Sequence, residues 1–338
     1  MAVNRRDFLR NTLHSSVWLL ALNELLAVGF WGKTEPDQSL KISIQCYSFV
    51  SEIFKGSFDI LDFPKRIRED FGLSAAEYWN IPLAQKRKNP EFLKEIQKRT
   101  ADQGIVNTLM LVDLINFQDR SKSLSLCDSN KVKRDMAVAA HHEWIDVAKK
   151  IGCSAIRVNL RAQQMSADEV AKVSEESLQQ LLEYSAAREI SIVIENHGGY
   201  TSDAQWVVAL MKKINNSYLG TLPDFGTSNF CVERAPAKEG DYFSSECLEQ
   251  YDKYKGVKEM LPYAKGISAK TTEFDANGEA IHTDFKRMLD LIKASSFEGY
   301  LAIEYEGGMM QRYGGKGDYL PPKEGILATK KLIEKYRS

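Results

Sequence analysis

The sequence has few of the cysteine patterns that mark disulfide-rich or zinc-binding proteins. Its 338 residues include five cysteines, which are odd in number, far apart and never arranged as a Cys-x-x-Cys pair. This spacing argues against a disulfide scaffold and against a thiolate zinc site. Cys46 and Cys153 lie in apolar runs, where we expect small buried core residues.

Neither sign of charge is in excess. Lysine and arginine number 45, aspartate and glutamate number 46, and no block of five or more like charges occurs. The sequence therefore predicts no nucleic-acid-binding surface and no charged tail for a partner. Its length and 43% hydrophobic content are ample for a sizeable core, and no internal repeat or low-complexity linker divides the chain.

A long hydrophobic run is also lacking. The most apolar stretch, Val17–Trp31, carries Asn23 and Glu24 and is too short for a convincing membrane span. It follows the sequence NRRDFLR, and paired arginines before Phe-Leu and an apolar region resemble a twin-arginine export signal. The alternative is an amphipathic N-terminal helix.

On the export interpretation, residues 1–39 form a signal and N-terminal segment, and the mature chain starts somewhere between about Gly32 and Ser39. The protein would then be periplasmic, with no stable membrane insertion after the signal is removed. Twin-arginine export carries folded proteins, so the resemblance implies that a metal could be loaded in the cytoplasm.

From Lys41 onward, short apolar runs alternate with longer amphipathic ones. We expect strands near 41–49, 73–78, 105–112, 153–160, 191–195, 218–225, 266–270 and 300–306. We expect helices near 63–71, 89–103, 131–150, 166–188, 202–214, 247–264, 284–294 and 322–336, with Ser166 and Ser202 as N-caps of two of them.

Eight strand–helix units predict an α/β fold, a single-domain (β/α)8 TIM barrel over residues 40–338. A doubly wound open sheet is the main competitor. The first strand is not followed by a GxGxxG turn, which weakens a dinucleotide-binding version of that fold. The longest irregular connections, 118–131 and 229–246, follow strands and would lie on the catalytic face of a barrel.

Chemically active residues stand at the carboxyl ends of these strands, which meet at one mouth of a barrel. They are Glu77, Arg157, Asn159, Glu195, His197, Asp224, Ser268, Lys270, Glu304 and Glu306. Carboxylates in apolar strands are costly to bury without a cation. Glu195, Asp224 and Glu304 therefore predict a divalent-ion site of the magnesium or manganese type. The alternative is an isolated salt bridge at each position.

The strings IENHGG, LPDFGTSNF and LAIEYEGG resemble, in order and spacing, the xylose isomerase-like TIM-barrel superfamily of sugar phosphate isomerases and epimerases. The resemblance covers about residues 41–336. It implies one divalent ion (Mn, Mg, Co or Zn) held by Glu195, Asp224 and Glu304. It also implies that Glu195 and Glu304 move a proton between carbons of a sugar or keto-sugar, whose C–H the ion makes easier to deprotonate.

The sequence departs from the family at the seventh strand, where Ser268 stands at the usual histidine ligand position. The fourth ligand would then be water, substrate or His197. Lys270 keeps its place, and we predict that it binds a substrate oxygen or acts as an acid or base. Alternatively, Lys270 forms a salt bridge to Glu304 or Asp224, which is compatible with a catalytic role.

We assign His197 to catalysis because a histidine in a glycine-rich loop beside carboxylates titrates usefully near neutral pH; a hydrogen bond to backbone is the alternative. Arg157, Asn159 and Glu77 are candidate substrate-binding residues. Arg157 suits a sugar hydroxyl or an oxyanion, or else compensates the charge of Glu195. Glu77 could instead only buttress the barrel.

These residues predict a metal-dependent isomerase or epimerase whose partner is a small-molecule sugar. Because an exported enzyme rarely meets sugar phosphates, we expect an unphosphorylated sugar or keto-sugar. A lyase or hydratase acting on a keto-sugar or glycoside derivative and a non-catalytic sugar-binding barrel are the alternatives. A phosphodiester hydrolase is disfavoured because only five histidines occur. Oligomeric state stays open, with a homo-oligomer as one outcome.

Overall fold

The computed structural model describes residues 40–162, 165–236, 245–312 and 314–337. One compact unit spans Leu40–Ser338. The predicted export signal and its alternative, an amphipathic helix, lie outside the described residues. Within the described ranges, no helix is both long enough and apolar enough to cross a membrane.

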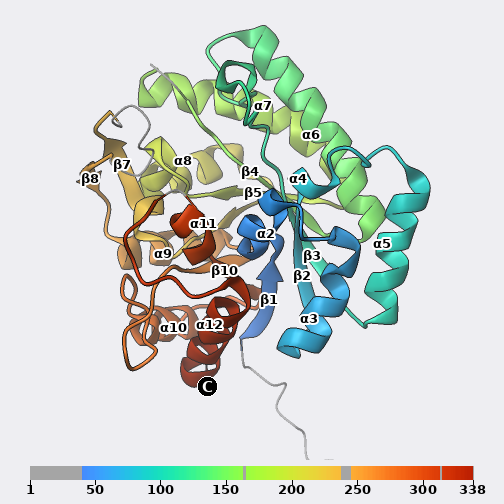
Figure 1. Cartoon of the computed structure of the whole chain (residues 1–338). Coiled ribbons are helices and arrows are strands. Elements are labelled where there is room, and N and C mark those ends of the chain that lie inside the picture. The colour runs from blue at the N-terminus through green and yellow to red at the C-terminus, as the bar shows by residue number, and fades with distance from the viewer. Residues whose placement is uncertain (1–39, 163–164, 237–244, 313, 338) are drawn as a thin grey trace, which may run out of the picture. The chain divides into compact units, whose positions relative to one another are not determined.

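Eight parallel strands form the centre of the molecule (Figure 1). They are β1 (Lys41–Gln45), β2 (Ala75–Trp79), β3 (Val106–Leu111), β4 (Ala155–Val158), β5 (Ser191–Glu195), β6 (Leu219–Leu222), β9 (Ile267–Thr271) and β10 (Tyr300–Tyr305). Their order is β6-β5-β4-β3-β2-β1-β10-β9. Parallel bridges from Thr221 to Ala264 and from Asp224 to Ser268 connect the two ends of this sheet. The predicted (β/α)8 barrel is therefore confirmed.

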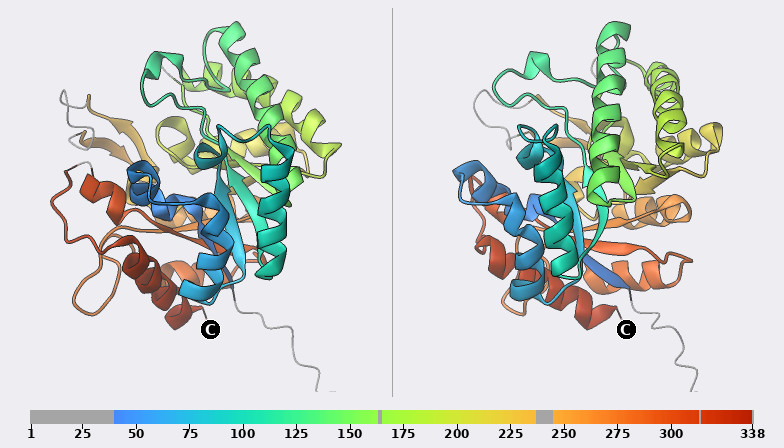
Figure 2. Two further views of the ribbon diagram at one scale, coloured as in Figure 1. Left: turned by 45° about the vertical axis from the view of Figure 1, so that its right-hand side comes forward. Right: turned by 90° about the vertical axis from the view of Figure 1, so that its right-hand side faces the viewer.

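Helices surround the strands on the outside, as the two turned views make plain (Figure 2). The longer ones are α3 (Phe63–Phe71), α5 (Pro90–Asp102), α6 (Lys131–Ile151), α7 (Ala167–Ala186), α8 (Ala204–Ile214), α9 (Lys253–Met260), α10 (Phe285–Lys293) and α12 (Pro322–Tyr336). The shorter ones are α2 (Val50–Lys55), α4 (Asn80–Leu83) and α11 (Gly307–Arg312). Each long helix turns an apolar stripe toward the strands, as a barrel requires.

The interior of the barrel is not wholly apolar. Buried branched side chains dominate the strands, but Ser43, Gln45, Glu77 and Ser268 place polar groups inside. Ser43 Oγ donates to Glu77 Oε1 at 3.3 Å, and Gln45 Nε2 donates to Ser268 Oγ at 2.6 Å. Buried polar groups are usually hydrogen-bonded, and these two bonds connect β1 to β2 and to β9 across the interior.

Of the two predicted helix N-caps, Ser166 is confirmed and Ser202 is wrong. Ser166 forms a capping box with Glu169 at the start of α7. Ser202 does not cap α8: Asp203 does, accepting from Gln205 N and Trp206 N. Ser202 Oγ donates to Asn229 O at 2.6 Å instead, because a tertiary partner competes for its hydroxyl.

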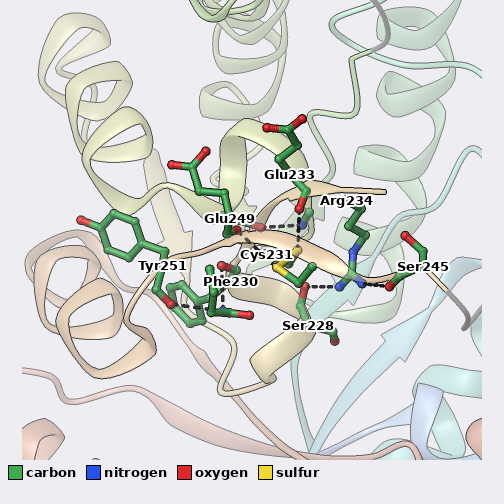
Figure 3. Close-up of a disulfide and its surroundings, with 12 residues drawn as sticks. Ser228, Phe230, Cys231, Glu233, Arg234, Ser245, Glu249 and Tyr251 are labelled. Carbon is green, nitrogen blue, oxygen red and sulfur yellow. Dashed lines mark hydrogen bonds between the residues drawn. A yellow bond between two sulfur atoms is a disulfide. The ribbon is translucent and has the colours of Figure 1, made fainter. Parts of the chain in front are cut away.

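The predicted helix over 247–264 was wrong in its first part. Cys247–Gln250 forms strand β8, which pairs antiparallel with β7 (Cys231–Arg234). A disulfide joins Cys231 to Cys247 across this hairpin (Figure 3). The sequence analysis did not predict this bond. Cys46 and Cys153 are buried, as expected for core residues.

Candidate active site at the mouth of the barrel

Three carboxylates from separate strands converge at the carboxyl end of the barrel. Glu195 is the last residue of β5, Asp224 follows β6, and Glu304 is the fifth residue of β10. All three are buried, and one oxygen of each lies within 4.8 Å of the others. The sequence analysis predicted these three residues as a cluster, and the structure brings them together.

The Asp224 carboxylate is held in one orientation by its own loop. Its Oδ1 accepts from Gly226 N at 2.6 Å, and its Oδ2 accepts from Asn229 Nδ2 at 2.7 Å. Asn229 lies in the short 3-10 helix Thr227–Phe230 that precedes the disulfide hairpin. Asn196, next to Glu195, fixes the backbone of Asp224 by exchanging two hydrogen bonds with it. The loops after β5 and β6 are therefore locked together around the cluster.

Lys270, on β9, places its ammonium group among these carboxylates. Nζ lies 2.9 Å from Asp224 Oδ2, 3.5 Å from Glu304 Oε1 and 3.3 Å from Glu306 Oε1. The lysine passes close to Gly226, where a β-carbon would lie 2.7 Å from Lys270 Cδ. The salt-bridge alternative for Lys270 is thus observed, and a catalytic role stays a prediction.

The cluster has more negative charge than Lys270 neutralises. Burial raises the pKa of Asp224 to about 6 even though Lys270 opposes that shift. Burial likewise raises the pKa of Glu304 well above its usual range, and Asp224 and Glu306 add to the effect. Burial would lower the pKa of Lys270, but the surrounding carboxylates raise it well above normal. An excess of buried carboxylate over cation is the electrostatic condition for binding a metal ion.

A second group of charges surrounds Glu195. Arg157, on β4, lies 3.0 Å from Glu195 Oε2 through Nε and 2.9 Å from Asp113 Oδ1 through Nη1. Burial raises the pKa of Glu195, but Arg157 and His197 more than offset it and bring the pKa to about 2. Glu195 is therefore kept ionised, whereas burial favours the protonated form of Glu304 in the absence of an added cation. These contacts match the charge-compensation alternative for Arg157, and its substrate-binding role stays a prediction.

His197 lies beside Glu195, after the end of β5. Its Nδ1 is 3.3 Å from Glu195 Oε2 and 2.9 Å from Asn159 Oδ1. Arg161 Nη2 lies 3.3 Å from Nδ1 and 3.4 Å from Nε2. Burial lowers the pKa of His197, and the Arg161 cation lowers it further. The imidazole is 31% exposed, so a small molecule at the mouth can reach it.

Ser268 occupies the strand position where the resemblance expects a histidine ligand. Its hydroxyl is fully buried and accepts from Gln45, so the Ser268–Gln45 pair fills that place by a hydrogen bond. Glu77 lies in the interior layer, only 1% exposed. Burial raises its pKa to about 8, and this depth suits the buttress role better than a contact with substrate.

The three clustered carboxylates fit a divalent ion. Among the described residues, Oε2 of Glu304 is buried with no hydrogen-bond partner, and Oε2 of Glu195 forms only ion-pair contacts, with Arg157 Nε at 3.0 Å and His197 Nδ1 at 3.3 Å. Buried carboxylate oxygens normally find a donor or a cation. Three carboxylate oxygens form a hard donor set of the kind that Mg²⁺ and Mn²⁺ prefer. Glu195, Asp224 and Glu304 are the residues that would hold the ion.

Sequence reasoning missed three residues of this site. Asp113 directly follows the third predicted strand and carried the same strand-end signal as the residues that were chosen. Arg161 lies three residues past β4, directly after the predicted strand 153–160. Asn229 lies seven residues past β6 in the 3-10 helix Thr227–Phe230, where no sequence pattern marks it. Asn229 acts through contacts that only the folded loop creates.

The fold and the site together define a TIM-barrel protein with a carboxylate cluster at its mouth. The chain belongs to the family described as Xylose isomerase-like TIM barrel, which it matches over residues 67–335. No curated protein matches the sequence significantly.

Solved structures match across nearly the whole barrel. D-psicose 3-epimerase from Clostridium cellulolyticum H10 has a TM-score of 0.64 at 12% identity, covering 88% of this chain and 100% of that one. The 3-keto-D-glucoside 4-epimerase YcjR from E. coli has a TM-score of 0.62 at 12% identity, covering 88% and 99%. A xylose isomerase domain protein from Planctomyces limnophilus has a TM-score of 0.61 at 15% identity, covering 88% and 98%.

Further matches include an IOLI protein with a bound zinc atom, a Mycobacterium smegmatis barrel in complex with magnesium and a probable 3-DHS dehydratase, AsbF, from Bacillus anthracis. The structural neighbours thus include sugar epimerases, isomerase-type barrels and a probable dehydratase. At these identities the likeness establishes the fold and leaves substrate and reaction to be argued from the site.

Proposed function

We propose that this protein is a metal-dependent isomerase or epimerase of an unphosphorylated sugar or keto-sugar. The observation that carries the proposal is the convergence of Glu195, Asp224 and Glu304, with one oxygen of each within 4.8 Å of the others. A divalent ion bound there would polarise a carbonyl oxygen and a neighbouring hydroxyl, which makes the C–H between them more acidic. The sugar epimerases among the structural neighbours support this reaction class.

The chain's own residues divide the acid and base roles. Arg157 keeps Glu195 ionised, whereas burial and like charges raise the pKa of Glu304. Two carboxyl groups whose pKa values are pushed apart in this way are suited to take and return a proton. Glu195 is the proposed base and Glu304 the proposed acid. Lys270, fixed between Asp224 and Glu304, is placed to donate to a substrate oxygen.

Charge balance favours a neutral substrate. When all carboxylates are ionised, as binding of an ion would require, five of them face three basic groups, a net charge of −2 that one divalent ion would cancel: Asp113, Glu195, Asp224, Glu304 and Glu306 against Arg157, Arg161 and Lys270. This count leaves out a nearby lysine, Lys253, because its ammonium group donates to Phe225 O, Thr227 Oγ1 and Thr283 Oγ1. A phosphate would add charge that this balance does not compensate, so an unphosphorylated sugar fits better.

The test has two parts. First, metal content is measured by mass spectrometry on chain purified without chelator, beside Glu195→Ala, Glu304→Gln and the remote control Asp146→Asn. We expect about one Mn, Mg, Co or Zn per chain in the wild type and the control, and loss in both cluster variants. Wild-type chain that takes up no metal even from excess ion would contradict the proposal.

Second, candidate sugars and keto-sugars are incubated in D2O with the loaded protein and followed by NMR. Solvent deuterium at the carbon next to the carbonyl is the expected result, because isomerisation and epimerisation both exchange that proton. Release of water or of a leaving group would identify the lyase alternative. Unchanged turnover in Glu304→Gln would remove Glu304 from the mechanism.

The non-catalytic alternative is less well supported. A binding protein has no need to keep three buried like charges, whose desolvation costs free energy unless a cation compensates them. A phosphodiester hydrolase of the related multi-metal type is also disfavoured, because the carboxylate cluster within the described residues includes no histidine.

We also propose export by the twin-arginine route to the periplasm. The Cys231–Cys247 disulfide supports it independently of the signal sequence, because disulfides persist mainly in oxidising compartments. The test replaces Arg5 and Arg6 by lysine and fractionates the cells. We expect the wild type in the periplasm and the variant in the cytoplasm; equal distribution of both would contradict the proposal.

A further inference from the structure

Asp113 is a buried carboxylate of the site with three hydrogen-bond donors, and the proposed reaction does not use it. It lies just past β3 and is 8% exposed. Oδ2 accepts from Trp79 Nε1 at 2.8 Å, and Oδ1 accepts from Arg157 Nη1 at 2.9 Å and Asn159 Nδ2 at 2.7 Å. Asn80 fixes its backbone through a reciprocal pair of 3.0 Å bonds. Three donors on two oxygens keep this carboxylate ionised and immobile.

This arrangement decides which way the Asn159 amide faces. An ionised carboxylate can only accept hydrogen bonds, so the Asn159 atom at 2.7 Å from Asp113 must be the NH2 group. The amide oxygen of Asn159 then faces His197 Nδ1 at 2.9 Å. Because that oxygen can only accept, Nδ1 must carry the proton.

Two further contacts agree. Nδ1 also faces the Glu195 carboxylate, another acceptor, at 3.3 Å. Arg161 has only donors, and its Nη2 lies 3.3 Å from Nδ1 and 3.4 Å from Nε2. Because Nδ1 already faces two acceptors, Nε2 is the ring nitrogen left to accept from the guanidinium. The backbone of His197 is fixed as well, since its N–H donates to Thr201 Oγ1 at 2.9 Å.

We infer that Asp113 is a positioning residue: through Asn159 it holds His197 in the Nδ1–H tautomer and leaves Nε2 as the basic nitrogen. The tautomer itself does not depend on the proposed function; only the role of Nε2 as a base in catalysis rests on it. The tautomer also means that the Nδ1 face, which points toward Glu195, carries a proton and cannot bind a metal ion. His197 then offers Nε2 as its basic nitrogen, and Nδ1 is not available as the fourth metal ligand.

Nitrogen-15 NMR of the imidazole rings in the full chain at about pH 8, where a histidine of lowered pKa is neutral, tests this directly. Correlations to the ring protons distinguish the protonated from the unprotonated nitrogen, and His197→Gln identifies the signals. We expect wild-type His197 with a proton on Nδ1 and a bare Nε2. A wild-type Nε2–H tautomer would overturn the inference.

Two variants test the relay and one controls for it. Asn159→Leu removes the amide oxygen, and Asp113→Leu removes the carboxylate that orients it. In each we expect a several-fold rise in the Nε2–H form. Trp79→Phe removes a donor to the other oxygen of Asp113 and should leave the tautomer unchanged. If Asp113→Leu does not fold, Asn159→Leu and the wild type still decide.

Persistence of the wild-type tautomer in the Leu variants would mean that Glu195 alone fixes His197, and Asp113 would not be a positioning residue. These readouts need neither substrate nor metal. Failure of the proposed sugar chemistry would leave them unaffected, and failure of the relay would leave the carboxylate cluster as proposed.

Discussion

At the scale of single residues, burial changes the protonation of acids that the sequence presents as ordinary. Glu77 receives a hydrogen bond from Ser43 on Oε1, whereas its Oε2 has no partner within the described residues. Burial raises its pKa to about 8. The group is therefore neutral in the folded protein over a range where it is charged in the unfolded chain.

The sign of the pH effect follows. An unfolded glutamate ionises near pH 4.3, so the stability contributed by neutral Glu77 is complete below that pH and is lost as pH rises toward 8. Glu77→Gln, a neutral side chain of the same shape, should leave the unfolding free energy nearly unchanged at pH 4. At pH 8 it should raise that free energy by on the order of 5 kcal/mol.

Urea unfolding at the two pH values measures this difference. Equal destabilisation at both would show that the fold needs the carboxyl group of Glu77 itself and would contradict the expected pH dependence.

Gly226 has no side chain, and this leaves room for Lys270 beside the carboxylate cluster. A β-carbon there would lie 2.7 Å from Lys270 Cδ and 3.0 Å from Asp224 Oδ1. Gly226→Ala should displace both charged groups and weaken Mn²⁺ binding by about 10- to 100-fold, the usual effect of disturbing the groups that support a ligand. Calorimetric titration measures the dissociation constant.

The matched control is Gly152→Ala. Gly152 has φ +86° and open space around its β-carbon, and it lies before β4, at the opposite end of the barrel. Backbone strain should lower its stability without changing metal affinity. An equal loss of affinity in both variants would mean that general destabilisation explains the effect.

At the scale of elements, the hairpin of β7 and β8 joins the fold next to the site. Tyr251 N donates to Phe230 O at 2.8 Å, and Arg234 Nη2 donates to Ser228 O at 2.9 Å (Figure 3). The hairpin begins two residues after Asn229, which orients Asp224. The disulfide therefore closes a loop whose base supports a proposed metal ligand.

Replacing both hairpin cysteines by serine should lower stability through the unfolded chain. The disulfide spans a sequence separation of 16, and a closed loop of that length contributes about 3 kcal/mol in the chain-entropy account. We expect the double variant, compared with the wild type by urea unfolding, to lose roughly that amount. Because the backbone bonds at the hairpin base remain, Mn²⁺ affinity should change less than in Gly226→Ala.

Two observations would contradict this expectation. An unchanged unfolding free energy would mean that the disulfide does not stabilise the fold. A metal affinity lower than that of Gly226→Ala would mean that the disulfide is the main support of Asp224.

At the scale of the whole molecule, charged side chains from several strands meet at the mouth of the barrel. If Glu195, Asp224 and Glu304 bind an ion, only the folded chain has the site, and the ion must stabilise the fold. Mn²⁺ at 100 times its dissociation constant should add about 2.7 kcal/mol. This appears as a higher melting temperature by differential scanning calorimetry, reversed by chelator.

Glu304→Gln should melt at the same temperature with and without the ion, because a ligand and a charge are lost. An equal rise in wild type and variant would indicate binding elsewhere on the protein.

The sequence by itself determined the architecture. The alternation of apolar runs with amphipathic ones is a local property that each segment carries alone, and it predicted eight units and the parallel barrel. The same pattern placed Glu195, Asp224 and Glu304 at strand ends, where the geometry of a parallel barrel must bring them together.

Tertiary structure decided what local patterns do not contain. The Cys231–Cys247 pairing and strand β8 depend on a hairpin partner. The pKa of Glu77 depends on burial by distant strands, and the tautomer inferred for His197 depends on a carboxylate 84 residues earlier in the chain, Asp113. These are non-local interactions, set by which atoms meet after folding, and no single stretch of the sequence encodes them.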